Sequence, residues 1–336
     1  MTIQDSLRHL TALSHFSLEQ LEKLSRAAEV LRAPAAEVVV GYGEETHRLH
    51  GLVKGTLAAQ RSTPHGDFVL GRLRSGELFG EPGLVDRQPR SSDIVAAADC
   101  DLVRFGAEAL DELCAADRSF DLALHWALWI SMSRKLRITT RMLGHFFAGH
   151  QNGATPTTVG PAGGGKPIEV LARAKRDLFL EQELSNLEAN FLASLSTAER
   201  IPAGRTIFRE GEPAEKLYFV HDGEVRISRT LPGAGEEALA ILKRGEVFGE
   251  MSLVDGRPRI ADAVAHEGDV DLLTVPSAVV SRLLDVDKLS SPLLLKMFCR
   301  TLSRRLRSLD DKIVGWFLLS GGDSTVIGTS PVATRN

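Results

Sequence analysis

The chain has 336 residues, of which 43% are hydrophobic and 25% are charged, and its formal net charge is −4. This length exceeds one ordinary domain core and predicts two domains, while the composition excludes disordered and fibrous proteins. Because the net charge is slightly negative, the protein lacks the overall positive charge with which nucleic-acid-binding proteins neutralise phosphates.

The cysteines and the first residues indicate a cytoplasmic protein. Cys100, Cys114 and Cys299 are odd in number and unrelated in spacing, which fits neither a disulfide framework nor a zinc or iron–sulfur ligand set. Residues 1–10 contain no apolar signal-peptide core, and no window approaches the roughly 18 apolar residues of a membrane-spanning helix. We therefore expect reduced thiols, no metal, no membrane contact and a cytoplasmic location.

The first 75 residues predict a short helix followed by a small β-structure. Ser17 and Gln20 have the spacing of a capping box, and the apolar Leu24 and Ala28 follow at helical spacing. Residues 37–73 then break into short apolar runs separated by Gly, Pro and Asp, which is typical of a small β-barrel or sandwich.

The segment 72–93 carries the most informative chemistry. Gly80 and Glu81 predict the start of a short helix, whose free N–H groups and dipole favour an anion, and glycine lets the anion approach the backbone. Arg90 can return to the same place and offer a charged donor fork to phosphate oxygens. An ionised Glu81 only accepts hydrogen bonds, so it should contact sugar hydroxyls. These residue types describe a site for a cyclic nucleotide.

A long amphipathic helix is predicted after this segment. Apolar residues step by threes and fours along one face. They are Leu122, Trp126, Trp129, Met132, Leu136 and Leu143. This stripe can dock onto its own β-structure, form a dimer seam, or do both, and the sequence leaves these alternatives open.

Residues 148–167 are rich in Gly, Pro and Thr and predict a flexible linker, after which the chain repeats itself. The segment 72–93 aligns without a gap with 241–262, at an offset of 169 residues. Gly55 aligns with Gly223 at an offset of 168, which keeps nearly the same register. The pattern indicates duplication of a whole domain.

The two copies therefore define the expected domain limits, with domain A at 1–147, domain B at 168–320 and a disordered tail at 321–336. Residues 131–137 align with 301–307, so the second copy also ends in a long helix. Its apolar stripe comprises Leu295, Phe298, Leu302, Leu306, Leu309 and Ile313.

The order Phe-Gly-Glu, Leu and then Pro-Arg, with glycine turns such as Gly211 and Gly223, resembles the phosphate-binding cassette of the cyclic-nucleotide-binding domain family. This family includes bacterial catabolite activators, kinase regulatory subunits and nucleotide-gated channels. The resemblance covers nearly the whole chain twice. It implies a mainly β fold with flanking helices (α+β), made of two tandem β-roll, jelly-roll-like domains that each end in a long helix.

The resemblance also implies roles for individual residues. Glu81 and Glu250 would accept the ribose 2′-hydroxyl, and Arg90 and Arg259 would bind the cyclic phosphate. Nearby backbone N–H groups, and the hydroxyl of Ser91, would donate to the phosphate. The predicted ligand-binding residues are Gly80, Glu81, Gly83, Arg90 and Ser91 in the first copy and Gly249, Glu250, Ser252, Arg259 and Ala261 in the second. The alternative without ligand binding is an empty pocket in which Glu81 and Arg90 form an internal ion pair.

Both copies depart from the family pattern. Pro82 removes one N–H, which the first position of a helix tolerates, and Ile260 stands where a small residue usually follows the arginine. Asp93 and Asp262 lie three residues beyond each arginine, and strand alternation should point them to the opposite face.

The identity of the ligand stays open at this point. The family reads the base partly from the long helix, so Ser133 and Ser303 are candidates for a hydrogen bond to it. The expected ligand is cAMP or cGMP, with no cofactor, and a cyclic dinucleotide is the alternative.

Other functions find less support in the sequence. No helix-turn-helix follows Ile313, so we expect no DNA binding. Arg173, Lys175 and Arg176 only faintly resemble a kinase-inhibitory segment. His47 and His50 alone do not make the converging ligand set of a cupin-like metalloenzyme, and we expect both on the surface or in loops.

The resulting hypothesis is a sensor without catalytic residues, in which ligand capture shifts a long helix that an unknown effector protein reads. A homodimer through the long helices belongs to this hypothesis. The competing hypothesis is a dimeric scaffold whose pockets are vestigial.

Overall fold

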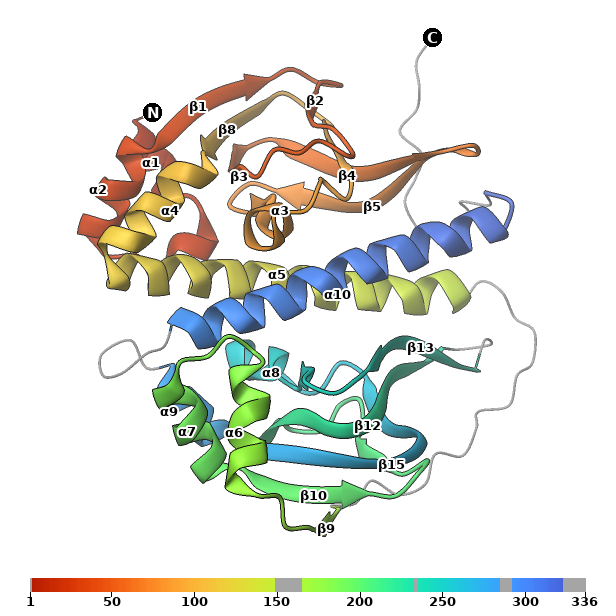
Figure 1. Ribbon diagram of the computed structural model, residues 1–336. Coiled ribbons are helices and arrows are strands. Elements are labelled where there is room, and N and C mark those ends of the chain that lie inside the picture. The colour runs from red at the N-terminus through yellow and green to blue at the C-terminus, as the bar shows by residue number, and fades with distance from the viewer. Residues whose placement is uncertain (1, 149–164, 232–234, 285–291, 323–336) are drawn as a thin grey trace. The chain divides into compact units, whose positions relative to one another are not determined.

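The computed structural model describes residues 2–148, 165–231, 235–284 and 292–322, which form two compact units (Figure 1). The first unit consists of residues 2–148 together with 303–322, and the second consists of the described residues between 165 and 302. Each unit contains one copy of the sequence repeat, apart from the end of the last helix, which belongs by its contacts to the first unit.

The first unit is a β-roll with helices before, inside and after it (Figure 1). Its helical elements are α1 (Ile3–Arg8), the 3₁₀ helix η1 (Thr11–Leu13), α2 (Leu18–Arg26), α3 (Glu81–Asp86), α4 (Ala107–Ala116) and α5 (Arg118–Ala148). Its strands are β1 (Ala28–Ala33), β2 (Val38–Val40), β3 (Leu49–Lys54), β4 (Thr56–Thr63), β5 (Gly66–Arg74), β6 (Leu78–Phe79), β7 (Asp93–Ala96) and β8 (Cys100–Phe105).

These strands form two antiparallel sheets, in the orders β1-β8-β3-β6 and β2-β7-β4-β5. Alternating apolar residues of both sheets, including Leu52, Leu57, Phe79 and Leu102, bury one shared core. The predicted β-roll with flanking helices is confirmed.

The second unit repeats this architecture with longer strands. Its strands are β9 (Lys166–Pro167), β10 (Thr197–Ile201), β11 (Thr206–Phe208), β12 (Lys216–Leu231), β13 (Gly235–Leu242), β14 (Val247–Phe248) and β15 (Asp262–Pro276). Its helices are α6 (Ala172–Leu180), α7 (Asn186–Leu195), α8 (Met251–Asp255), α9 (Ser277–Leu283) and the first part of α10 (Pro292–Leu319).

Strand register confirms that the repeat is structural. Leu52 pairs with Leu102, and the aligned Val220 pairs with Leu272. The single strand β12 corresponds to both β3 and β4 of the first unit. The strands of the second unit therefore join into one seven-stranded sheet.

The helix starts follow local sequence signals. Ser17 and Gln20 form the predicted capping box of α2, and Ser185 and Glu188 form an equivalent one in α7. Ala28, which helical spacing placed on the first helix, is instead the first residue of β1, because α2 ends at Arg26.

Both long helices bury most of the predicted stripes, although Trp126 is half-buried and the burial of Leu143 lies outside what the structure describes. Trp129 and Met132 of α5 and Phe298 and Leu302 of α10 are fully buried. The sequence predicted that each stripe packs on its own β-structure or in a dimer seam. Neither alternative accounts for the end of α10. From Ser303 onward this helix packs within the first unit, where the Phe317 ring lies 4.5 Å from that of Phe68.

The expected domain limits change in two places. Domain B was predicted to extend to residue 320, but 303–322 belong to the first unit. The predicted linker 148–167 lies largely outside the described residues; its last two residues, Lys166 and Pro167, form β9 and pair with Arg200 and Glu199. The predicted tail also lies outside the described residues beyond Gly322.

Among the described helices, none combines the length and hydropathy that crossing a bilayer requires.

Gly55 gives a test of the β-roll corner between β3 and β4. Its φ of +103° disfavours any side chain, and a Cβ there would lie 2.6 Å from the Asp99 carbonyl oxygen. Gly66 has a nearly identical φ of +102°, but a Cβ there would meet no atom within 4 Å. Gly66→Ala therefore isolates backbone strain of roughly 1–2 kcal/mol, whereas Gly55→Ala adds a collision.

We expect Gly55→Ala to lower the free energy of unfolding by at least about 1 kcal/mol more than Gly66→Ala. Urea denaturation followed by tryptophan fluorescence measures this selectively, because Trp126, Trp129 and Trp316 all belong to the first unit. Equal losses would contradict a close approach of two backbones at this corner.

Candidate functional site

The segment 78–90 connects β6 to α3 and then folds back on itself. Gly80 has a φ of +88° and stands at the N-cap of α3, as the sequence predicts. A Cβ on this glycine would lie 2.7 Å from both Nη1 of Arg90 and the carbonyl oxygen of Arg48. Glycine is therefore required by its backbone angle and by the closeness of the arginine.

Arg90 closes this loop from inside. Its Nη1 donates to the Gly80 carbonyl at 3.0 Å and its Nη2 to the Arg48 carbonyl at 2.5 Å. The side chain is 5% exposed, and among the described residues its Nε has no hydrogen-bond partner. A buried guanidinium stays charged, and Arg90 lines the site with this Nε donor unpaired.

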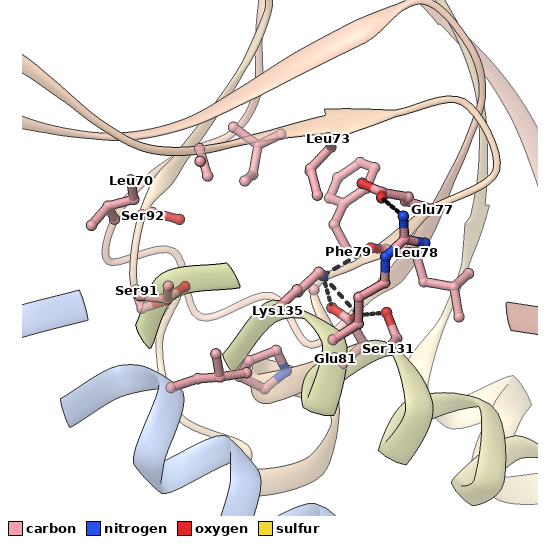
Figure 2. Close-up of a pocket in the computed structure, with 18 of the residues that line it drawn as sticks. Leu70, Leu73, Glu77, Leu78, Phe79, Glu81, Ser91, Ser92, Ser131 and Lys135 are labelled. Carbon is pink, nitrogen blue, oxygen red and sulfur yellow. Dashed lines mark hydrogen bonds and ion pairs between the residues drawn. The ribbon is translucent and has the colours of Figure 1, made fainter. Parts of the chain in front are cut away.

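Glu81 is fully buried and is bound by helix α5 (Figure 2). Both carboxylate oxygens accept from Lys135 Nζ at 2.7 Å, and one also accepts from the Ser131 hydroxyl at 2.5 Å. Burial alone would raise the pKa of Glu81, but attraction to Lys135 and these hydrogen bonds outweigh it and lower the pKa. Glu81 is therefore an ionised carboxylate.

The Glu81–Arg90 ion pair, offered as the alternative without ligand binding, is not formed. Arg90 binds backbone carbonyls, whereas Glu81 pairs with Lys135. The sequence could not anticipate this partner because α5 returns to the loop only in the folded domain.

A cavity of about 340 Å³ opens beside these groups, in the size range of small-molecule sites. All five residues predicted for the first copy line it: Gly80, Glu81, Gly83, Arg90 and Ser91. Apolar walls come from Leu70, Leu73, Ile94, Ile130 and Ile138. Figure 2 shows Glu81, Ser131 and Lys135 together, with Ser91 and Ser92 apart from them, in a mostly apolar cavity.

Asp310 of α10 adds one more carboxylate to the cavity wall. Burial and the neighbouring Asp311 raise the pKa of this half-buried group to about 7. Its charge is therefore partly neutralised at neutral pH, which reduces its repulsion of an anionic ligand.

Neither serine of the long helices that the sequence offers as a candidate base contact lines the described cavity. Ser133 is buried outside the cavity lining, and Ser303 donates to the Asp86 carboxylate at 2.6 Å. The helix instead presents Ser131 and Lys135, one turn apart, to Glu81. The repeated block 131–137 contained this signal, since residues four apart share a face.

The second unit repeats the loop closure. Arg259 donates to the Gly249 carbonyl at 2.7 Å and to the Lys216 carbonyl at 2.6 Å, as Arg90 does at the aligned positions. Its Nε likewise has no hydrogen-bond partner in the described part of the chain. The other predicted residues of this copy, Glu250, Ser252 and Ala261, are also buried.

Arg259 differs from Arg90 in its aromatic neighbours. Its guanidinium carbon lies 4.3 Å from the ring centroid of Phe208 and 5.8 Å from that of Tyr218. Both rings belong to the core of this unit, so the cation is stabilised internally by their faces.

The remaining expectations for charged residues and histidines have mixed outcomes. Asp93 and Asp262 accept backbone N–H bonds from Tyr42 and Glu210, and Asp93 is not among the residues that line the cavity. His50, expected on the surface or in a loop, is 3% exposed and stacks on Phe79. Burial and nearby arginines lower its pKa to about 3, so its ring is neutral.

The family model of the cyclic nucleotide-binding domain matches residues 30–117 and 198–287, more than half of the chain. The chain belongs to the cyclic nucleotide-binding domain family. Each match covers one β-roll and its glycine-led loop, so the molecule contains two cyclic nucleotide-binding domains in tandem. The predicted resemblance is confirmed for both copies.

Curated relatives match parts of these cyclic nucleotide-binding domains. The cyclic AMP receptor protein of Thermus thermophilus is 42% identical over 113 residues, which are 32% of this chain and 48% of that protein. The cGMP-dependent protein kinase egl-4 of Caenorhabditis elegans is 21% identical over 274 residues, which are 81% of this chain and 29% of that protein. The chain thus spans only part of the length of the relatives it matches.

Solved cyclic nucleotide-binding domains are also similar to this chain. A domain from Methylobacillus flagellatus is 27% identical with a TM-score of 0.39, covering 46% of this chain and 86% of that one. The regulatory domain of Toxoplasma gondii PKA, crystallised with cAMP, is 18% identical with a TM-score of 0.32, covering 84% and 91%.

Lys135 provides a test of the buried carboxylate. Lys135→Met keeps the aliphatic stem but leaves Glu81 buried without its cation. We expect the free energy of unfolding of the first unit to fall by about 3 kcal/mol at pH 7, the lower part of the range for broken buried pairs because Lys135 is 25% exposed. Urea titration with tryptophan fluorescence measures the loss.

The pH dependence of this loss has a defined sign. The lowered pKa of Glu81 in the wild type gives stability that is present above the unfolded value, near 4.5, and is lost as pH falls through the folded value. In the variant, burial loses its main counterweight, Lys135, and the Ser131 hydrogen bond alone does not offset it, so the pKa rises and the penalty is relieved on acidification. The difference between the two proteins should shrink from pH 7 to about pH 4, and Glu81→Gln should rescue Lys135→Met. An undiminished difference would contradict a charge effect.

Proposed function

We propose that this protein is a cyclic-nucleotide sensor that binds cAMP or cGMP and regulates a protein partner in the cytoplasm. The single observation that carries the proposal is Arg90, a buried cation whose Nε donor is unmatched beside a cavity entered by a glycine-led helix start. A cyclic phosphate supplies the missing negative charge and acceptor. No chemical step is assigned to the site.

In this proposal the cavity orients the nucleotide by its two ends. The phosphate lies against Arg90, Ser91 and the backbone near Gly80 and Gly83, and the ribose hydroxyl donates to Glu81. Lys135 and Ser131 hold the Glu81 carboxylate in place before the ligand arrives, which reduces the ordering required on binding. The apolar wall receives the base.

The first unit is the proposed principal site. Arg90 faces the cavity, whereas Arg259 is already stabilised by the faces of Phe208 and Tyr218. A phosphate in the second unit would have to compete with these contacts, so its binding should be weaker.

The proposed signal leaves the site through two long helices. Glu81, at the start of α3, is bound by α5 through Lys135. Asp86, at the end of α3, is bound by α10 through Arg307, with two bonds of 2.7 and 2.9 Å. Arg307 also donates to the Pro89 carbonyl, next to Arg90, at 2.7 Å. A ligand that moves the loop therefore moves groups attached to both helices.

The binding test below also distinguishes two other functions. A cyclic dinucleotide receptor would prefer cyclic di-GMP, and a scaffold with vestigial pockets would bind no nucleotide. Homodimerisation through the long helices and the identity of the effector are parts of the proposal that the binding test does not require.

Isothermal titration with cAMP, cGMP and cyclic di-GMP tests the binding proposal. Arg90→Ala removes the proposed phosphate contact and should weaken binding by about 2–5 kcal/mol. Arg259→Ala is the matched control at the aligned position and should leave the tighter binding event within about threefold, a change of less than 1 kcal/mol. Unfolding curves of each variant report whether its loop still folds.

Two results would overturn this assignment. Unchanged affinity in both variants would exclude the arginines as the phosphate site. Loss of the tighter event in Arg259→Ala alone would move the principal site to the second unit.

Hydrogen exchange along residues 303–319 tests the proposed transmission. Ligand binding should change exchange in this segment of the wild type, and Arg307→Ala should abolish that change while affinity stays within about tenfold, or 1.4 kcal/mol. Arg304→Ala, an exposed arginine on the same helix, is the control and should behave like the wild type. A full response in Arg307→Ala would show that the signal does not pass through Asp86.

A further inference from the structure

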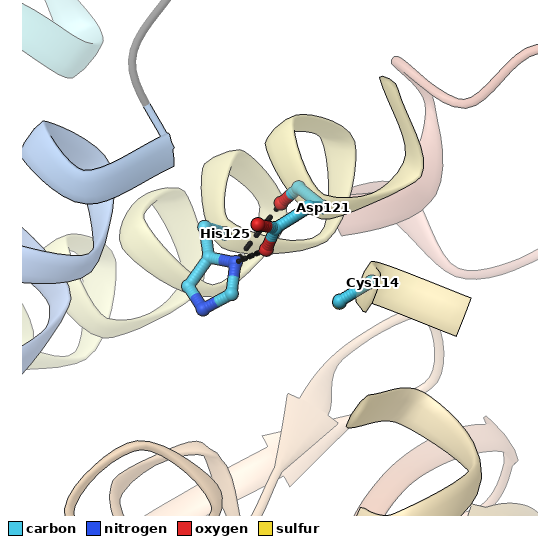
Figure 3. A group of neighbouring side chains, drawn as sticks. All are labelled: Cys114, Asp121 and His125. Carbon is cyan, nitrogen blue, oxygen red and sulfur yellow. Dashed lines mark hydrogen bonds and ion pairs between the residues drawn. The ribbon is translucent and has the colours of Figure 1, made fainter. Parts of the chain in front are cut away.

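Cys114, Asp121 and His125 lie together where α4 meets α5, away from the nucleotide cavity lining (Figure 3). One ligand atom from each residue lies within 4.8 Å of the other two. Asp121 is 7% exposed, and His125 and Cys114 are partly buried. The cysteine spacing in the sequence shows no ligand pattern, because Cys114 meets Asp121 and His125 only in the folded domain.

From this geometry, we propose that Cys114, Asp121 and His125 form a binding site for a divalent transition-metal ion of the zinc type. A thiolate, an imidazole and a carboxylate are ligands that zinc accepts together in one tetrahedral site. Bond lengths of about 2.0–2.3 Å place such ligand atoms on the order of 3.3–3.6 Å apart, so small side-chain rotations complete the site. The fourth position is left for water or an exogenous ligand.

The ligand set also selects the kind of metal. Calcium and magnesium prefer all-oxygen sites, whereas thiolate and imidazole favour zinc, cobalt and related ions. The cluster is therefore not an acidic cation site, and its carboxylate and imidazole already lie in contact. His125 Nδ1 lies 2.8 Å from Asp121 Oδ1 and 2.9 Å from the Asp121 carbonyl oxygen.

The helix junction positions the three ligands. Asp117 adopts an extended conformation between α4 and α5, and its side chain caps the N–H groups of Ser119 and Phe120. Lys23 binds the same carboxylate at 2.6 Å. Asp117 is thus committed to holding the turn, which brings the last turn of α4 against the first turns of α5.

A metal at this site would connect α4 to α5 directly. The same helix α5 carries Ser131 and Lys135 to Glu81, about two and three turns beyond His125. The angle between α4 and α5 would then depend on metal occupancy. The proposal stands on the cluster alone and is independent of nucleotide binding.

The chain contains its own matched control. Asp5 and His9 have the same four-residue spacing as Asp121 and His125, and His9 Nδ1 lies 2.6 Å from the Asp5 carbonyl oxygen. This pair is exposed and is not part of the cysteine cluster. A helical Asp–His pair that merely satisfies a ring nitrogen would make both pairs equivalent.

Titration of the chelator-treated full chain with Co²⁺ tests the site. Tetrahedral thiolate coordination should produce a charge-transfer band in the near ultraviolet and intense visible bands, saturating at one ion per chain, and Zn²⁺ should displace the cobalt. Cys114→Ser should abolish the charge-transfer band, and His125→Gln should weaken binding by at least about 100-fold, since even outer-shell changes cost 10- to 100-fold. His9→Gln should leave the titration unchanged.

Several results would overturn the proposal. The wild type could give no charge-transfer band, or the band could persist in Cys114→Ser and so belong to another cysteine. Equal effects of His125→Gln and His9→Gln would indicate that the histidine acts only as a helix contact. Because the wild-type titration decides the first outcome, a variant that folds poorly does not leave the proposal untested.

Discussion

The buried arginine of each cyclic nucleotide-binding domain is the contact on which the rest of the site depends. Arg90 joins the carbonyls of Gly80 and Arg48, so two loops distant in sequence are fixed by one guanidinium. The fork satisfies them with one donor from each terminal nitrogen, and Nε has no hydrogen-bond partner in the described part of the chain. The same buried guanidinium therefore fixes the loop geometry and favours an anionic ligand, because a buried charge is costly without a partner.

The buried arginines of the two domains have different neighbours. In the first unit, the carboxylate of Glu81 is balanced by Lys135 from α5, and Arg90 remains beside a cavity. In the second unit, Arg259 lies over the ring of Phe208. Identical loop closure can therefore accompany unequal ligand affinity, since the neighbours of the arginine, more than the loop, determine its free energy without ligand.

The short helix α3 connects the cavity to the helices around it. Its first residue, Glu81, contacts α5, and its last residue, Asp86, contacts α10 within the first unit. Helix α5 also carries Asp121 and His125 near its start. Under the two proposals above, the same helix contacts the nucleotide site at one point and the metal site at another, and a packed helix moves as a body.

The sequence by itself determined the duplication, the two β-rolls, the capping boxes and the glycine-led loops with their arginines, because these depend on local backbone preferences and on a pattern written twice. Only the tertiary structure decided that Lys135 neutralises Glu81, that His50 is buried, that α10 ends in the first unit and that Cys114 meets Asp121 and His125. Those outcomes depend on which helix faces meet after folding. Apolar spacing predicts that a face is buried, but it does not specify the surface that covers it.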